Sequence, residues 1–173
     1  MHSYGKFALA LALALIMTGV VTCAGASAPK VAVFDFELVD TSLEGATYGP
    51  RADQQAHLAA AANYLRGRLA KSGRFDVVDV APVAARAHAS NLQACGGCDM
   101  SFARELGAKF AVTGWVQKVS NLILNMNVVV RDVDTGKTVA GKSVDMRGNT
   151  DESWSRAIAW LVDNYLLAGQ GAF

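Results

Sequence analysis

The chain has 173 residues, of which 52% are hydrophobic and 18% charged. This length suits one domain and is too short for two of ordinary size, and the hydrophobic content excludes a disordered chain. Without Lys6, which lies in the targeting segment described next, 15 basic residues balance 15 acidic residues. A net charge of zero gives no electrostatic reason to expect nucleic acid or an anionic membrane as a partner.

Residues 1–28 have the pattern of a secretory signal peptide. Lys6 precedes an apolar run over residues 7–17, and a tail of small residues follows. The run is short for a permanent membrane span, which needs ~20 apolar residues. The sequence therefore predicts export from the cytoplasm and no membrane span once the signal has been removed.

The tail of this segment offers more than one processing site. Two Ala-x-Ala patterns predict cleavage after Ala26 or after Ala28. The alternative is lipidation at Cys23, which would make the protein an outer-membrane lipoprotein. We expect a periplasmic protein with a single α/β domain over residues 29–168 and a C-terminal tail over 169–173.

The first elements of the domain are predicted to be a strand, a loop and a long helix. Residues 30–38 are apolar at first and then alternate, which is typical of a buried strand that emerges at its end. Residues 39–50 contain Gly, Pro, Asp, Ser and Thr and predict a loop of about a dozen residues. Residues 52–71 predict a helix with an apolar face at a helical spacing. That face consists of Leu58, Ala62, Leu65 and Leu69.

The middle of the chain predicts a second strand and two helices. Residues 74–80 alternate in part, as in a strand. Pro82 then opens a short helix, where proline is favoured. After a cysteine-containing loop over residues 91–97, a further helix is expected to begin at Cys98 and to end at Gly107.

Three strands and a last helix complete the domain. Strands are predicted over residues 109–119, 122–133 and 138–147, and a glycine-containing turn over 134–137 joins the last two as a hairpin. One apolar face of the second of these strands comprises Leu122, Leu124, Met126, Val128 and Val130. Thr150 is expected to cap the last helix. The buried face of that helix comprises Trp154, Ile158, Leu161 and Tyr165. The order of elements predicts an α/β fold, with a mixed sheet of about five strands and helices packed on it.

The domain contains two cysteines, Cys95 and Cys98, separated by two glycines. In an exported chain this pair predicts a disulfide. A thiol-disulfide redox site is the main alternative, because a helix that begins at the second cysteine lowers a thiol pKa. A zinc site would need two further ligands, for which the domain offers His57 and His88 in unrelated segments. Covalent haem attachment is excluded, since Asp99 stands where that motif requires histidine.

Four carboxylates follow one another near the first strand: Asp35, Glu37, Asp40 and Glu44. Oxygen ligands of this kind suit a hard cation such as calcium, so they are weak candidates for a metal site. The alternative is that they are solvated at a strand end and in a loop. We predict no catalytic residue and no cofactor, because the sequence has neither a nucleophile motif nor a phosphate-binding loop.

One strand also carries a polar face opposite its apolar one. Asn125, Asn127 and Arg131 share this face. Such an amide-rich surface suits either solvent or a polar partner, and antiparallel sheets commonly leave one face wet.

Two segments resemble a known group of envelope proteins. Residues 31–36 are similar to the opening strand of the amino-terminal domain of TolB and of CsgG-like proteins, and residues 103–114 resemble the helix–glycine–strand step of that domain. The resemblance implies a small α/β envelope module that binds other proteins and catalyses nothing. The sequence lacks the later TolB propeller and the pore-forming segments of CsgG.

A second resemblance is to an uncharacterised family of secreted bacterial proteins. It rests on residues 95–98, 114–124 and 147–154. The resemblance implies an association with periplasmic quinoprotein alcohol oxidation and identifies no active residue.

These observations lead to one expected function and two alternatives. The expected function is that of an exported periplasmic accessory protein without catalytic activity, which binds another envelope protein. The first alternative is a thiol-disulfide redox protein that uses Cys95 and Cys98. The second alternative is a carboxylate metal-binding protein.

Overall fold

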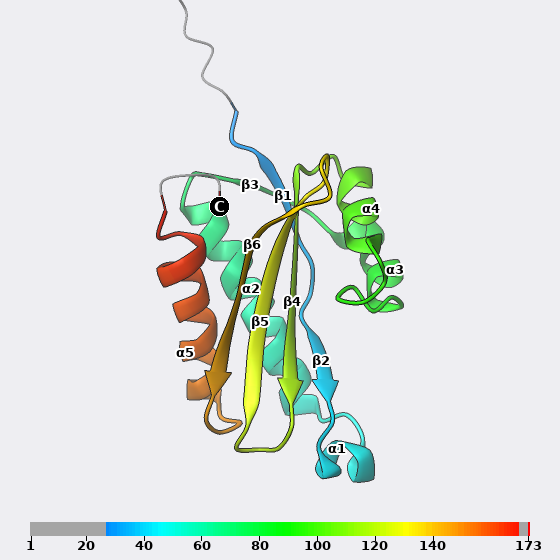
Figure 1. The fold of residues 1–173 in the computed structure, drawn as a ribbon, viewed down its shortest axis with the longest axis vertical. Coiled ribbons are helices and arrows are strands. Elements are labelled where there is room, and N and C mark those ends of the chain that lie inside the picture. The colour runs from blue at the N-terminus through cyan, green and yellow to red at the C-terminus, as the bar shows by residue number, and fades with distance from the viewer. Residues whose placement is uncertain (1–26, 170–172) are drawn as a thin grey trace, which may run out of the picture.

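A computed structural model describes residues 27–169 and 173 of the chain. They form a mixed α/β fold built on a six-stranded sheet, as the order of elements predicted (Figure 1). The predicted signal peptide, its cleavage sites and Cys23 lie outside the described residues, apart from Ser27 and Ala28. The strand order is β3–β1–β4–β5–β6, and β2 also pairs with β4.

The sheet combines a parallel part with two antiparallel hairpin pairings. The strands are β1 (Lys30–Val33), β2 (Glu37–Asp40), β3 (Asp76–Val78), β4 (Phe110–Lys118), β5 (Leu124–Asp132) and β6 (Thr138–Met146). The first four run in the same direction, whereas β5 pairs antiparallel with both β4 and β6. The helices are α1 (Leu43–Tyr48), α2 (Ala52–Lys71), α3 (Ala84–His88), α4 (Cys98–Glu105) and α5 (Asp151–Leu161), with a 3-10 turn η1 (Ala81–Val83) and a π turn η2 (Val162–Leu166).

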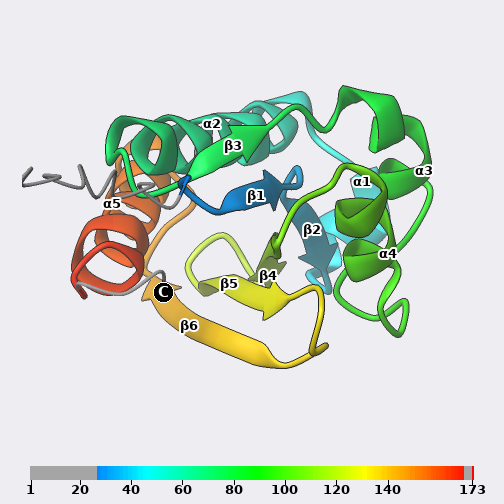
Figure 2. The ribbon, with the colours of Figure 1, turned by 90° about the horizontal axis from the view of Figure 1, so that it is seen from above.

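The sheet separates two hydrophobic cores. Helices α2 and α5 pack on one face, and α3 and α4 cover only part of the other (Figures 1 and 2). Because side chains alternate along a strand, β1 contributes to both cores. Val31 and Val33 are buried beneath α2, while Ala32 and the following Phe34 are buried on the side of α3 and α4.

The predicted strand over residues 30–38 is interrupted by a β-bulge. Val33 lies opposite Val112, and Glu37 lies opposite Trp115. Glu37 is thus four residues after Val33, whereas their partners in β4 are only three residues apart. The extra residue divides the expected strand into β1 and β2, which is why the sheet has six strands rather than five. Bulges of this kind bend a strand and re-aim its side chains.

The ring of Phe36, which follows the bulge, packs against the backbone of β4. It lies directly on Gly114 of β4, where a Cβ atom would overlap three ring carbons. Phe36 is only 5% exposed and belongs to the core beneath α2. The chain therefore needs a glycine at position 114 to bring this ring against the backbone of β4.

Three local predictions need correction. The segment 39–50, expected to be a loop, contains the end of β2 and the helix α1. Leu122, expected on the apolar face of its strand, lies in the β4–β5 turn and is 73% exposed. The last helix ends in the π turn η2, in which Leu166 is fully buried and Tyr165 is only partly buried against the core.

Tyr165 and the end of the chain both contact the rest of the fold. The Tyr165 hydroxyl donates to Gly141 O at 3.0 Å and accepts from Gly141 N at 3.2 Å, on the outer edge of β6. Phe173, in the predicted tail, stacks on Phe75 with ring centroids 4.4 Å apart.

We expect Gly114→Ala to destabilise the protein by about 1–3 kcal/mol, because the added methyl displaces the Phe36 ring from a packed core. Gly67→Ala is the control, since Gly67 lies in the interior of α2 with open space around it. Alanine is the better helix former, so this variant should gain about 0.5–1 kcal/mol. Urea unfolding measures both, and equal stabilities for the two variants would contradict the role given to Gly114.

Candidate functional site

An open cleft of about 540 Å³ lies beside the bulge, between α2 and the segment that follows β3. We call that segment, residues 81–97, the arm. The cleft is at the carboxyl end of β1. On one side of it the chain continues through α2 over one face of the sheet, and on the other side the chain reaches β4 through α3 and α4 over the opposite face. Ligands of open α/β sheets bind at such positions. Its floor includes the buried side chains of Phe34, Leu58 and Leu92, and exposed polar side chains of Gln55 and Asn63 lie at its rim.

Asp35, in the bulge, connects the two walls of the cleft. Its Oδ1 accepts from Arg66 Nη2 of α2 at 2.6 Å, and its Oδ2 lies 2.7 Å from His88 Nε2 of the arm. Arg66 also donates to the carbonyl of Val33 from Nε and Nη2, at 3.0 and 2.8 Å. Burial alone raises the pKa of the Asp35 carboxyl, but the hydrogen bonds and charges of Arg66 and His88 outweigh it and leave that pKa below 3.8.

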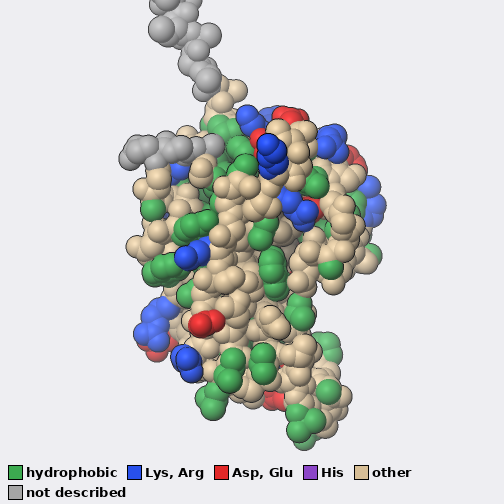
Figure 3. Space-filling model, in the orientation of Figure 1, with side chains coloured by type: hydrophobic (Ala, Val, Ile, Leu, Met, Phe, Trp, Pro, Cys, Tyr) green, Lys and Arg blue, Asp and Glu red, His purple; other side chains and the backbone are tan. Residues whose placement is uncertain are grey.

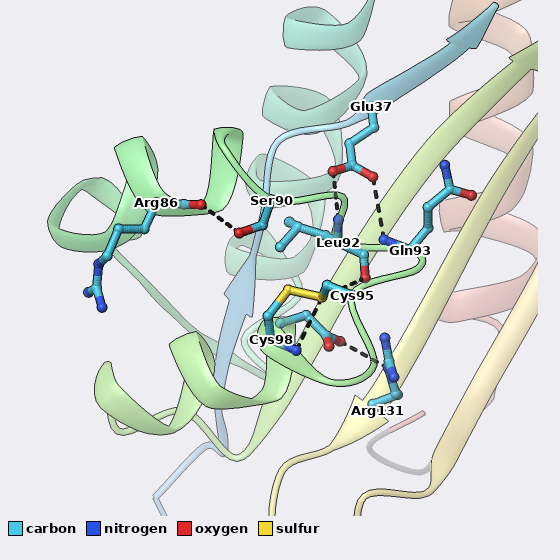
Figure 4. Close-up of a disulfide and its surroundings, with 9 residues drawn as sticks. Glu37, Arg86, Ser90, Leu92, Gln93, Cys95, Cys98 and Arg131 are labelled. Atoms are coloured by element: carbon cyan, nitrogen blue, oxygen red, sulfur yellow. Dashed lines mark hydrogen bonds and ion pairs between the residues drawn. A yellow bond between two sulfur atoms is a disulfide. The ribbon is translucent and has the colours of Figure 1, made fainter.

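Glu37, on the same side of the bulge, holds the arm through its backbone. Its two carboxylate oxygens accept from the amides of Leu92 and Gln93, at 2.8 and 3.4 Å (Figure 4). The residue thus anchors the loop that leads into the cysteine pair. Neither Asp35 nor Glu37 is simply solvated, since both carboxylates fasten the arm to the sheet.

Cys95 and Cys98 form a disulfide at the end of the arm, with Cα atoms 5.7 Å apart (Figure 4). Cys95 is exposed, and Cys98 is the first residue of α4. The amide of Cys98 donates to Cys95 Sγ at 3.2 Å. The bridge therefore closes the turn that Gly96 and Gly97 make with positive φ angles.

A buried ion pair lies beneath this turn. Asp99 is fully buried at the start of α4, and its Oδ2 lies 2.9 Å from Arg131 Nε of β5. Burial raises the pKa of the Asp99 carboxyl despite the nearby guanidinium. The pair joins α4 to the sheet, so Arg131 does not belong to the predicted amide-rich polar surface. Asn125 instead donates to Asp145 at 2.8 Å, and Asn127 accepts from Ser143.

The other two candidate carboxylates lie at the opposite end of β2. Asp40 and Glu44 contact the ammonium of Lys118, at 3.3 and 2.7 Å, and the Lys118 side chain is only 1% exposed. The pKa of Glu44 is lowered by its hydrogen bond from Lys118, and that of Asp40 is lowered because hydrogen bonds from Ser42 and Lys118 outweigh burial. The structure thus separates the four candidate carboxylates into two pairs, each with its own cationic or amide partners.

Within residues 27–169 and 173, no group of three or more His, Cys, Asp or Glu side chains is placed to hold a metal ion. The zinc alternative would have used His57 and His88 together with the cysteines. His57 lies instead between α2 and α5, where its Nε2 is 2.6 Å from Asp151 and its ring lies 5.0 Å from that of Trp154. No helix in this part of the chain is long and apolar enough to cross a bilayer.

Five large hydrophobic side chains gather at the end of the molecule that Lys118 supports. They come from α1 and from the β4–β5 turn, which are both at the lower end of the fold (Figures 1 and 3). We call them the apolar tip: Leu43 (83% exposed), Tyr48 (80%), Val119 (50%), Leu122 (73%) and Ile123 (54%). The sequence did not predict this surface, because α1 was expected to be a loop and Leu122 a core residue.

The cleft combines an apolar floor with a polar rim. Among the described residues that line it, none is Ser, Thr, Cys or Lys, which supply most protein nucleophiles. Its carboxylates are held by an arginine, a histidine and backbone amides. Arg66, which holds Asp35, was not identified from the sequence, where it stood out only as a polar residue away from the apolar face of its helix.

Together, fold and cleft define a small single-sheet α/β protein with an open groove at the carboxyl end of its first strand. The chain belongs to the DUF3280 family, whose model, described as "Protein of unknown function (DUF2380)", matches residues 29–166. A search of curated protein sequences finds no match. The family description makes no reference to alcohol oxidation, so that association stays a prediction.

Several solved structures share part of the architecture. The C-terminal domain of LpoB from Escherichia coli is 17% identical, with a TM-score of 0.48 over 72% of this chain and 87% of that one. Lipoprotein GNA1162 from Neisseria meningitidis is 16% identical, with a TM-score of 0.46 over 82% and 99%. TolB from Acinetobacter baumannii is 16% identical, with a TM-score of 0.39 over 79% and 29%. Likenesses this remote carry no argument about function.

The lowered pKa of Asp35 predicts how stability responds to acid. A carboxyl with a depressed folded pKa stabilises the fold above its ordinary value of 3.8, and this contribution is lost as the pH falls through the folded value. We expect the Asp35→Asn variant to lose less stability than the wild type as the pH falls below 3.8, as measured by urea unfolding midpoints at a series of pH values. Asp134→Asn, on the exposed β5–β6 turn, is the control and should keep the wild-type slope. An unchanged slope in Asp35→Asn would show that its ion pairs do not stabilise the fold.

Proposed function

We propose that this protein is an exported, non-catalytic accessory protein of the cell envelope that binds another envelope protein in the cleft beside β1. The observation that carries this proposal is the cleft itself, whose floor is apolar and whose polar groups are already held in place. A pre-formed groove with a few fixed polar groups is typical of a binding site. The predicted signal peptide supports a periplasmic location.

The chemistry of the cleft also indicates what kind of contact the partner makes. Gln55 and Asn63 offer donors and acceptors at the rim. Asp35 is paired with Arg66 and His88, whereas the carboxylate of Glu37 is held only by backbone amides. A projecting segment of the partner with an apolar side chain for the floor and a basic group for the carboxylates would suit this site.

Site-specific cross-linking in the periplasm tests this proposal. A photo-reactive residue at Gln55, which is exposed at the rim, should yield one discrete cross-linked envelope protein, whereas the same residue at exposed Lys137 should not. Adding Ala59→Arg, which fills the cleft from α2, should reduce that product at least tenfold. Ala60→Arg is the matched control, because it lies next along α2 and lines the α2–α5 groove instead.

Two results would count against the proposal. Equal cross-linking in the Ala59→Arg and Ala60→Arg variants would remove the cleft as the binding site. A hydrolase or oxidoreductase turnover that is abolished by one substitution in the cleft would contradict the absence of catalysis.

A thiol-disulfide redox function is the second candidate, favoured by one contact. The amide of Cys98 donates to Cys95 Sγ at the first turn of α4, an arrangement that stabilises a thiolate on the exposed cysteine. The reduction potential distinguishes this function from a purely structural bridge. A structural disulfide lies below about −300 mV, and a distinctly more oxidising value would support the redox function.

A further inference from the structure

The apolar tip is an inverted surface, with its hydrophobic side chains outside and its polar ones inside. Beneath it, the side chains of Ser42 and Lys118 are buried, and the Lys118 ammonium is held by Asp40 and Glu44. Buried charge is costly unless it is paired, so this arrangement is held by a specific set of contacts. Side chains exposed to water ordinarily show the opposite distribution.

Several polar backbone groups of the tip are paired within the protein. The amides of Leu122 and Ile123 both donate to Ser120 Oγ at 3.2 Å, and Thr41 donates to the carbonyl of Lys118 from its amide and its hydroxyl. In α1, the hydroxyl of Ser42 caps the first turn by accepting from the amide of Gly45. Each amide that is paired in this way can leave water without becoming an unpaired donor, which lowers the cost of contact with a bilayer.

The size and shape of the tip favour a lipid surface over a protein surface. On binding, the five side chains would bury on the order of 500 Å² of surface between them. This area is smaller than the ~800 Å² that each side of a stable protein–protein interface buries. They project from a short helix and a tight turn at one end of the molecule, and none of them lines any of the four principal pockets of the described chain (Figure 3). A projecting apolar surface suits a partner that deforms around it.

We propose that the apolar tip inserts into the interfacial region of a lipid bilayer and holds the domain at a membrane surface. The attraction is hydrophobic rather than electrostatic, in keeping with the zero net charge of the mature chain and the internal pairing of Lys118. This site is separate from the cleft proposed to bind protein, since the two lie at different ends of β2. The domain could therefore contact a bilayer and a protein partner at the same time.

Flotation with vesicles of pure phosphatidylcholine tests this inference. The protein is taken from the periplasm as a Cys23→Ser variant, so that no acyl chain contributes to binding. We expect it to float with the vesicles, and to do so equally in about 0.5 M salt, which screens surface charge. The double variant Leu43→Gln/Leu122→Gln should partition at least tenfold less, because two apolar anchors are lost.

A matched pair of substitutions controls for surface hydrophobicity in general. Val139 and Trp160 are 43% and 42% exposed and lie away from the tip, so Val139→Gln/Trp160→Gln should partition as the parent does. Thermal unfolding of each variant shows that it is folded. Ala59→Arg should leave vesicle binding unchanged, which separates this inference from the proposed binding of protein in the cleft.

Three outcomes would overturn the inference. The parent protein fails to float, or both double variants lose binding to the same extent. In the third, Leu43→Gln/Leu122→Gln floats as the parent does but loses the cross-linked envelope protein, which would make the tip a protein-binding surface.

Discussion

The contact between the Phe36 ring and the backbone of Gly114 determines the geometry at the carboxyl end of β1. The ring occupies the space where a Cβ of residue 114 would stand, and the extra residue between β1 and β2 puts Phe36 in the same core as Val33. The resulting bulge turns Asp35 and Glu37 towards the arm, where one meets His88 and the other meets two backbone amides. The cleft exists because these carboxylates hold the arm beside α2.

The same bulge sets the position of β2 and of everything that follows it. β2 pairs with the last residues of β4 as far as Lys118. α1 begins three residues beyond the end of β2. Lys118 is drawn into the protein by Asp40 from β2 and Glu44 from α1. Burial of one ammonium thus orients α1, and the side chains left outside are those of the apolar tip. Cleft and tip are two consequences of one irregular strand.

The sequence predicted the elements whose side chains repeat regularly and missed those that depend on distant contacts. α2 has the predicted bounds, and its apolar face of Leu58, Ala62, Leu65 and Leu69 is buried, because a helical period over twenty residues is a strong local signal. The packing of Phe36 depends on a glycine far along the chain, and nothing local distinguishes that glycine from others. α1 is short and carries its apolar residues outside, so the hydrophobic pattern pointed to a loop. Among the candidate residues, the carboxylates were identified but their partners Arg66 and Lys118 were not. Arg66 is one of many polar residues of α2, and Lys118 ends a strand far along the chain from Asp40 and Glu44.

The hydroxyl of Tyr165 has a consequence for the behaviour of many copies of the protein. β6 is an edge strand of nine residues, and such an edge offers unpaired backbone groups to any other strand. The phenol engages both the donor and the acceptor of Gly141, near the middle of that edge. A strand from another molecule would find no free pair there and could add only a short segment on either side. This contact of Tyr165 therefore works against sheet-to-sheet aggregation.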